Sequence, residues 1–144
     1  MARALAYPAT RYSVEAPADL AERRTRDRLS GPGLKAFFNI MARWKIKDED
    51  ARALLGGVTN GPFYEMKRNP DRVLDTDRLT RISYLIGIFK DLQILHGRAL
   101  ADQWVQLPNS NPIFGGETPL AYMIRGGLPA MQTVRRLLDA RRAG

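Results

Sequence analysis

The longest apolar pattern in the chain, between residues 76 and 96, repeats at intervals of three and four residues. Its members are Leu79, Ile82, Leu85, Ile86, Phe89 and Leu92, and the stripe is widened by Ile88, Ile94 and Leu95. Because an α-helix has 3.6 residues per turn, this spacing gathers the side chains on one broad face. A helix that is apolar on most sides lies at the centre of a bundle or in a subunit interface. The sequence therefore predicts an all-α fold.

A second helical pattern follows the SGPG at residues 30–33, and we expect its helix to begin at Pro32, because proline suits a first helical turn. Its apolar face carries Leu34, Phe37, Phe38, Met41 and Trp44. We interpret this face as core. Residues 1–31 are expected to form a leader that is partly ordered and includes one short charged helix.

Composition limits the classes of protein that fit. The 144 residues correspond to one domain or two very small ones, with 44% hydrophobic and 26% charged residues. The absence of cysteine excludes a disulfide framework and thiolate metal sites, and it fits a reducing compartment. The N-terminus lacks a signal-peptide pattern, and no stretch is apolar enough to span a membrane. We expect a cytoplasmic protein that has no contact with membranes.

The formal net charge is +8 at pH 7. Excess positive charge favours polyanionic partners, because binding releases their condensed counterions. The charge therefore favours nucleic acid over a merely soluble basic protein.

Residues 48–70 have the pattern of a helix-turn-helix. Asp48 is expected to cap a first helix of small and apolar residues, which ends at Gly56-Gly57. A second helix, capped by Thr59 or Asn60, then ends at Asn69-Pro70. In this motif the second helix lays its N-terminal end in the major groove of DNA.

Five residues of this second helix are candidates for DNA contacts: Thr59, Asn60, Tyr64, Lys67 and Arg68. The first three would meet base edges or phosphates, and the two cations would lie near the DNA backbone. Gly61 and Pro62 lower the helix propensity at the start of this helix, which leaves specific base readout open.

The C-terminal third is punctuated by turn residues. A helix over RALADQWVQL is expected to bury Leu100, Trp104 and Leu107. Gly115-Gly116 is interpreted as a bend and not as a phosphate cradle, because no strand precedes it and Glu117 adds negative charge. Thr118-Pro119 then suits a helix start, a short helix ends at Gly126-Gly127, and a last helix begins at Pro129.

No catalytic pattern is present. HExxH, CxxC and GxSxG are all absent, and a single histidine cannot build a multi-histidine metal site. Carboxylate pairs occur at expected helix starts, where capping explains them. We therefore predict a binding protein that is not an enzyme and has no cofactor and no metal.

The segment from Trp104 to Gly127 resembles the C-terminal domain of the MbcA/ParS/Xre antitoxins. The matching residues are Trp104, Asn111, Pro112, Gly115, Gly116, Thr118, Pro119 and Leu120. The upstream residues Thr59, Tyr64, Lys67, Arg68 and Asn69 look like the Xre-type helix-turn-helix of the same family. The resemblance covers about residues 32–142.

The resemblance implies an Xre-type antitoxin of a RES–Xre toxin–antitoxin system. Residues 32–72 would form the DNA-binding region and residues 73–144 a small helical toxin-binding domain. Such an antitoxin dimerises, neutralises a RES-domain toxin that degrades NAD, and binds operator double-stranded DNA to repress its own operon. Deletion of residues 118–144 would then abolish neutralisation.

The candidate toxin-binding residues are all arginines: Arg125, Arg135, Arg136, Arg141 and Arg142. A pocket that binds NAD can itself be basic, so the group that blocks it is left open between an arginine and a backbone or C-terminal carboxylate group.

Two other binding functions are compatible with the residues alone. The first is a helix-turn-helix transcriptional regulator without a toxin partner. The second is an interaction module whose positive charge serves acidic proteins. An enzyme is the least favoured class.

Overall fold

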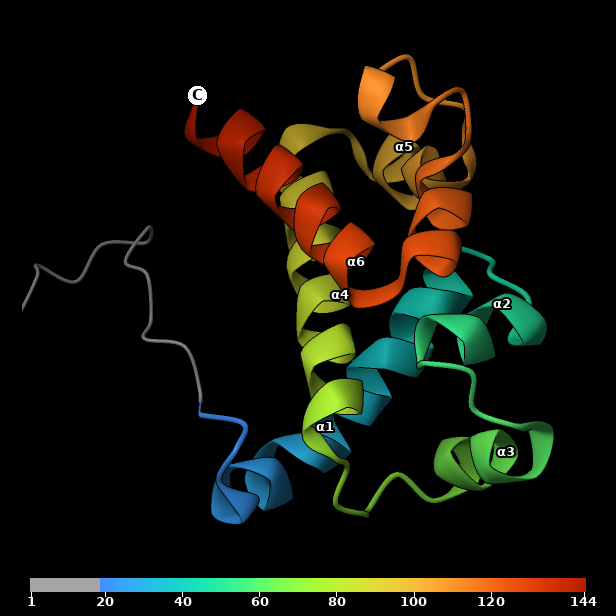
Figure 1. The fold of residues 1–144 in the computed structure, drawn as a ribbon, viewed down its shortest axis with the longest axis vertical. Helices are drawn as coiled ribbons and strands as arrows, with labels where there is room; N and C mark the ends of the chain where they lie inside the picture. The colour runs from blue at the N-terminus through green and yellow to red at the C-terminus, as the bar shows by residue number, and fades with distance from the viewer. Residues whose placement is uncertain (1–18) are drawn as a thin grey trace, which may run out of the picture.

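The structure, a computed structural model, describes residues 19–144 and is all-α over that range. Figure 1 shows how its helices are arranged. The α-helices are α1 (Arg23–Arg43), α2 (Asp48–Leu54), α3 (Asn60–Arg68), α4 (Thr76–Leu95), α5 (Arg98–Gln103) and α6 (Pro119–Ala143). Two short 3-10 helices are η1 (Trp104–Gln106) and η2 (Pro112–Phe114). The predicted fold class is confirmed.

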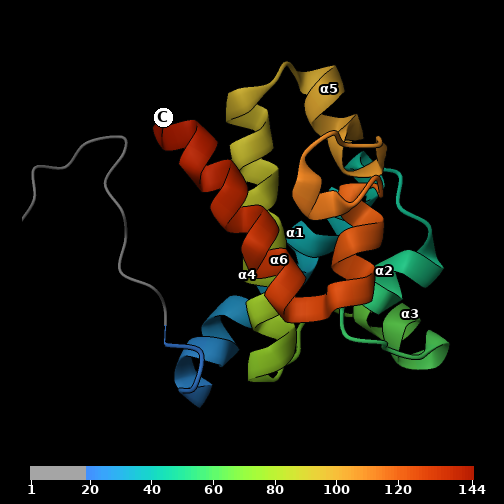
Figure 2. The same cartoon turned by 45° about the horizontal axis from the view of Figure 1, so that its top comes forward.

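Helix α4 is the centre of the bundle, as its apolar pattern predicts. Leu85, Ile88 and Leu92 are fully buried. Helix α1 crosses one side of α4. The second part of α6 runs beside α4, and both helices point toward the same end of the molecule (Figures 1 and 2). The start of α4 is fixed by Asp75, whose carboxylate accepts a hydrogen bond from the backbone N–H of Arg78 at 2.8 Å.

The prediction that a helix begins at Pro32 is wrong. Helix α1 begins at Arg23 and continues through Pro32. Proline usually excludes its predecessor from helical geometry through a clash with that residue's Cβ, and Gly31 has no Cβ. The buried Ser30 adds support, because its hydroxyl donates to the carbonyl of Arg26 and accepts from the N–H of Leu74. The expected boundary at residue 31 therefore falls inside a helix.

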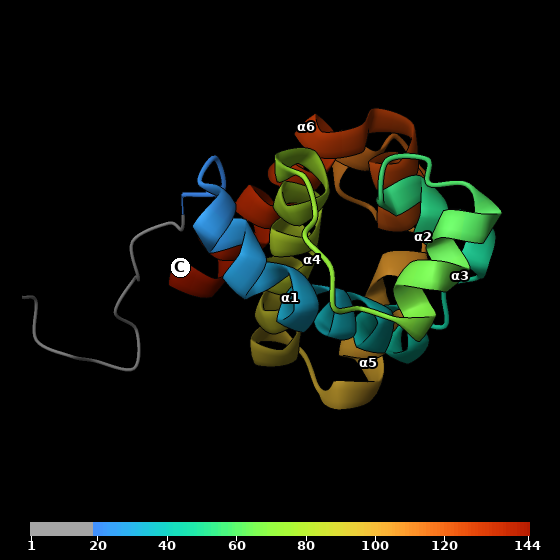
Figure 3. The ribbon, with the colours of Figure 1, turned by 90° about the horizontal axis from the view of Figure 1, so that it is seen from below.

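Helices α2 and α3 are joined by the glycine turn that the sequence indicates. Gly56 and Gly57 have φ values of +95° and +86°, in the region that glycine adopts without steric cost. Val58 is buried beneath the turn. The expectation that Asp48 caps α2 is wrong, since Lys47 holds the N-cap position and Asp48 is the first helical residue. Figure 3 shows α2 and α3 together on one side of the bundle.

The segment after α4 is less buried than expected. Trp104 is buried as predicted, but Leu100 and Leu107 are 44% and 40% exposed. The predicted helix is confirmed as α5, which passes into the 3-10 turn η1 at Trp104, but its two leucines face outward.

The loop before α6 is built by the residues of the turn motif. The Asn111 side chain accepts a hydrogen bond from the N–H of Ile113, and Gly115 and Gly116 have φ values of +56° and +86°. Phe114 is buried and makes edge-to-face contacts with Trp104 and Tyr122, at centroid distances of 6.1 and 5.3 Å. The prediction that the double glycine forms a bend is confirmed.

Helix α6 consists of two segments that meet at Gly127. The hydroxyl of Thr118 accepts from the N–H of Ala121, and Pro119 is the first helical residue, as predicted. Gly127 is not helical, with φ +64° and ψ −146°. The second segment buries Met131, Val134 and Leu138. The predicted division into two helices is therefore correct.

Among residues 19–144, none of the helices has the length and apolar character that crossing a membrane requires.

Candidate functional site

Two groups of predicted contact residues lie at separate places in the bundle. The α3 surface consists of Thr59, Asn60, Tyr64, Lys67 and Arg68. The α6 cations are Arg125, Arg135, Arg136, Arg141 and Arg142. Figures 1 and 2 show α3 near one end of the molecule and the end of α6 near the other. Each group is therefore treated as a separate candidate site.

Helix α3 is anchored by its apolar face. Phe63 and Met66 are buried, and the Phe63 ring makes an edge-to-face contact with Phe38 of α1 at 5.3 Å. This packing turns the opposite face outward, and all five residues of the α3 surface are exposed. The structure thus brings the predicted DNA-contact residues together on one accessible side of a helix.

Two residues of the α3 surface already have partners. The Tyr64 hydroxyl donates to a carboxylate oxygen of Asp48 at 2.8 Å, and this hydrogen bond raises the pKa of Tyr64. Arg68 forms an ion pair with Glu65. No such partner is found for Lys67 among the described carboxylates.

Gly61 and Pro62 do not prevent α3 from forming. They follow Asn60 in the first turn, where backbone N–H groups have no partner inside the helix, so proline removes nothing. Both residues are exposed, and apart from its two neighbours in the chain and the backbone of α3 itself, no atom lies within 4 Å of the Cβ position at Gly61. The first turn of α3 therefore presents an open, small-residue surface.

Arg135 of α6 lies against the backbone of α4. Its guanidinium occupies the place beside Gly87 where a Cβ would be, with that virtual Cβ only 1.9 Å from Nη1. Its Nη1 reaches the carbonyl of Ser83 at 3.5 Å, and its Nε donates to Asp139 at 3.2 Å. Arg135 is therefore engaged in holding α6 on α4.

Arg142 is also engaged with α4. Its Nη1 donates to Asp91 at 3.2 Å, and Asp91 is only 1% exposed. Burial and, to a smaller extent, the neighbouring Asp139 carboxyl raise the pKa of Asp91 to about 6, against the opposing effects of Arg142 and Arg135. Arg135, Arg142 and the two carboxyls form one charged cluster between the helices.

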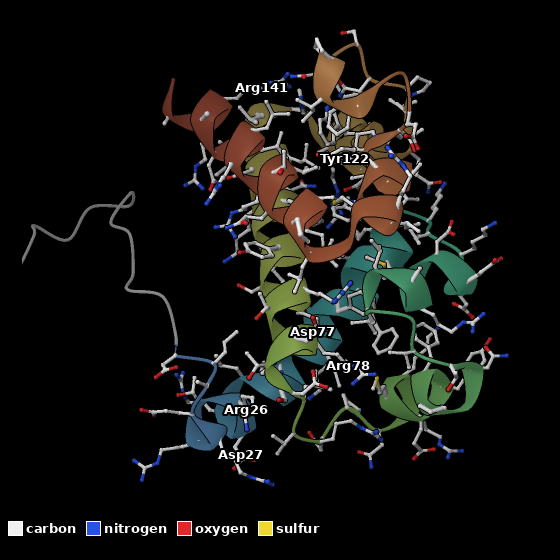
Figure 4. All side chains as sticks on the ribbon, viewed as in Figure 1. Arg26, Asp27, Asp77, Arg78, Tyr122 and Arg141 are labelled. Atoms are coloured by element: carbon white, nitrogen blue, oxygen red, sulfur yellow. The ribbon has the colours of Figure 1, made fainter. Side chains whose placement is uncertain are left out.

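The three other α6 cations face outward. Arg136 and Arg141 are exposed, and no hydrogen bond or ion pair to another described residue is found for either side chain. Arg141 extends from the end of α6 in Figure 4. Arg125 precedes the kink at Gly127 and is paired with Glu117. The structure therefore does not assemble the five arginines into one cluster.

Sequence reasoning missed Gly87, Asp91 and Asp139. A usable signal was present for Asp91, because a carboxylate interrupts an otherwise apolar helix pattern there. Gly87 is also a weak helix former in the middle of that pattern, which suggests close approach by another group.

Exposed apolar side chains form the second missed feature. The large apolar residues with substantial exposure after residue 90 are Ile94, Leu100, Leu107 and Ile113, at 58%, 44%, 40% and 39%. They come from the end of α4, from α5, from the residue that follows η1 and from η2 itself. Helical periodicity could not identify them, because two of them lie outside regular helix.

Within the described part of the chain, no group of three or more His, Cys, Asp or Glu residues is arranged to hold a metal ion.

Comparison with known proteins gives the family. Residues 91–144 match the model of the antitoxin Xre/MbcA/ParS C-terminal toxin-binding domain. This match includes the end of α4, the turn motif and all of α6. The chain belongs to the Xre/MbcA/ParS antitoxin family.

The chain is also similar to an uncharacterized protein, y4oB, of Sinorhizobium fredii. The two are 35% identical over 112 residues, which cover 77% of this chain and 84% of the relative. No solved structure matches the chain.

Proposed function

We propose that this protein is a type II antitoxin that neutralises a RES-domain, NAD-degrading toxin and represses its own operon by binding operator DNA as a homodimer. The observation that carries the proposal is the match of residues 91–144 to a toxin-binding domain. The antitoxin role follows from that domain. The RES identity of the toxin rests on the resemblance of the Trp104–Gly127 motif to RES–Xre antitoxins.

The turn motif acts as a scaffold in this proposal. Phe114 makes edge-to-face contacts with Trp104 and Tyr122, and Asn111 and Thr118 cap η2 and α6. These contacts are internal, so we assign these five side chains to positioning the exposed residues around them.

The toxin-facing surface is assigned to residues that lack internal partners. Exposed apolar side chains such as Ile94 and Leu100 supply the buried centre of a protein interface, where most binding energy arises. Arg136 and Arg141 are the outward cations of the last helix. Arg135 and Arg142 are assigned to holding α6 in place, since removing them would leave Asp91 and Asp139 without compensation.

DNA binding is assigned to the α3 surface. Its support is the exposure of Thr59, Asn60 and Lys67, the turn geometry at Gly56-Gly57 and the net charge of +8. We retain residues 32–72 as the DNA-binding region and residues 73–144 as the toxin-binding domain. We propose that the protein performs this function in the cytoplasm.

The proposal is tested by purification from the native operon. A partner protein should co-purify with the tagged chain in a stoichiometric amount. The isolated partner should consume NAD, and addition of the chain should stop that consumption. If the chain purifies without a partner but binds one DNA fragment of the operon, it would instead be a transcriptional regulator without a toxin partner. A partner without NAD-consuming activity would overturn the RES assignment and keep the antitoxin role.

A further inference from the structure

A shallow hollow lies between α1 and α3, beside the α3 surface. Its volume is about 380 Å³, and its lining consists of Lys35, Phe38, Asn39, Lys67 and Pro70. Lys35 and Asn39 are four residues apart on α1, so their side chains lie on the same side of the helix. The hollow therefore joins two elements that are distant in sequence.

The chemistry of this hollow suits an anion. Its charged groups are two ammonium ions, its amide side chain can donate hydrogen bonds, and no carboxylate lines it. The Lys67 ammonium lies 6.0 Å from the centroid of the Phe38 ring, a contact that orients it over the hollow. Among the described carboxylates, none pairs with Lys35 or Lys67.

The hollow continues along α3. A second hollow of about 420 Å³ is lined by Gly61, Tyr64, Glu65, Lys67 and Arg68. Lys67 lines both, so the two hollows meet at this side chain. Together they follow the side of α3 from its first turn to α1.

A carboxylate pair marks the other end of this path. A third hollow is lined by Asp27, Gly31, Pro32, Asp71, Arg72 and Val73. Asp71 follows Pro70, which lines the first hollow, and Asp27 precedes Lys35 on α1 by two turns. Two carboxylates and one cation, Arg72, line this third hollow, so it favours an anion less than the first hollow does. The carboxylate of the second hollow, Glu65, is paired with Arg68.

We propose that Lys35, Asn39 and Lys67 form a clamp for backbone phosphates of duplex DNA, flanking the bases that α3 faces. The inference rests on the proposed DNA-binding function and adds a contact from α1. Duplex DNA fits better than a free anion, because the site is open on one side and continuous with the α3 surface. Phosphate contacts of this kind fix the register of a protein on DNA without reading its sequence.

The experiment measures the salt dependence of binding to two duplexes of equal length, one from the region upstream of the gene and one of random sequence. The variants are Lys35→Ala, Asn39→Ala and Lys67→Ala, and Lys90→Ala on the exposed side of α4 is the charge-matched control. Melting curves first establish that every variant is folded.

Lys35→Ala and Lys67→Ala should each weaken binding to both duplexes by about three- to tenfold and lower the slope of log K against log salt by about 0.9. Asn39→Ala should weaken binding but leave the slope unchanged, because it carries no charge. Lys90→Ala should behave as the unchanged chain. Inorganic phosphate at constant ionic strength should not compete, since competition would assign the hollow to a free anion.

Three results would overturn the clamp in distinguishable ways. If the unchanged chain binds the upstream duplex and Lys35→Ala keeps its affinity and slope, the clamp is wrong while DNA binding stands. If the unchanged chain binds neither duplex at low salt, DNA binding and the clamp both fall. If Lys35→Ala still binds DNA but no longer binds a protein partner, the hollow is a binding site for an acidic protein.

Discussion

Asp91 shows how one residue can be structural inside a binding domain. It is almost fully buried, it pairs with Arg142, and its second carboxylate oxygen finds no hydrogen-bond donor. A buried carboxylate so placed binds a proton more tightly when the chain is folded than when it is unfolded. The stability of the α4–α6 contact is therefore expected to depend on pH.

The sign of that dependence follows from the pKa of Asp91, which burial raises to about 6 from 3.8. Below about pH 4 both states hold the proton, and the contribution of Asp91 to the free energy of unfolding declines as pH rises to about 6. Asp91→Asn removes this decline. Denaturation should therefore show the variant gaining about 1–3 kcal/mol relative to the unchanged chain between pH 4 and pH 7. If the difference in free energy of unfolding between the variant and the unchanged chain stays constant or falls as pH rises, the raised pKa is not that of Asp91.

Gly87 and Arg135 make a paired prediction. Gly87→Ala places a methyl group where the Arg135 guanidinium lies, so the guanidinium must move away. The helix propensity of alanine offsets part of the loss, by about 1 kcal/mol. Arg135→Ala should destabilise the unchanged chain by about 1 kcal/mol but have almost no effect in the Gly87→Ala background. Additive losses in this double-mutant cycle would show that the two residues are not coupled.

At the scale of elements, local patterns predicted most of the fold. The apolar period predicted α4, and the turn residues predicted the C-terminal end of α2, the bend at Gly115-Gly116 and the kink at Gly127. The start of α1 was missed because its continuation past Pro32 depends on Ser30 and Leu74, which are distant in sequence. The exposure of Leu100 and Leu107 was missed because it depends on how the loops pack.

The candidate sites were predictable to a lesser degree. The α3 surface follows from helical spacing, because Phe63 and Met66 fix which side is buried. The division of the α6 arginines does not, because Arg135 and Arg142 are distinguished from Arg136 and Arg141 by contacts with α4. Lys35 and Asn39 join the α3 surface through tertiary packing of α1, which no local pattern shows.

Gly127 determines the direction of the second segment of α6. Its φ of +64° and ψ of −146° belong to a region that is essentially restricted to glycine. Gly127→Ala should lower the free energy of unfolding by about 1–3 kcal/mol and weaken toxin binding by redirecting Arg136 and Arg141.

The matched control for this prediction is Gly33→Ala, because Gly33 lies inside α1 and a Cβ there would meet its nearest atoms at an ordinary contact distance of 3.6 Å. Its free energy of unfolding should stay equal or rise by up to about 1 kcal/mol. Equal effects of the two substitutions in thermal denaturation would refute a special role for the kink.

At the scale of the whole molecule, the α3 surface and the end of α6 lie apart, with α4 and α1 between them (Figures 1 and 3). This arrangement allows DNA and toxin to be held by different elements. Deletion of residues 118–144 would also remove Met131, Val134 and Leu138 from the core, so its effect cannot be limited to one contact. Surface substitutions separate the two activities more clearly.

The double variant Arg136→Ala/Arg141→Ala should bind the toxin about tenfold or more weakly, because arginine is enriched among the hot-spot residues of protein interfaces. Its melting temperature should be unchanged, since neither side chain has a partner within residues 19–144. Binding to random-sequence duplex should fall less than in Lys67→Ala. Titration calorimetry with the toxin and fluorescence anisotropy with DNA measure the two affinities. If the variant loses toxin affinity and DNA affinity equally, the two ligands bind one shared surface.

The most direct test of the account is a titration of the proposed RES-domain toxin, which we expect to be encoded beside this gene, with the purified chain, with NAD consumption as the readout. The account predicts that NAD consumption declines linearly and stops at a fixed stoichiometric ratio, and that Arg136→Ala/Arg141→Ala shifts the end point to higher concentration. NAD consumption that continues unchanged in the presence of excess folded chain would contradict it.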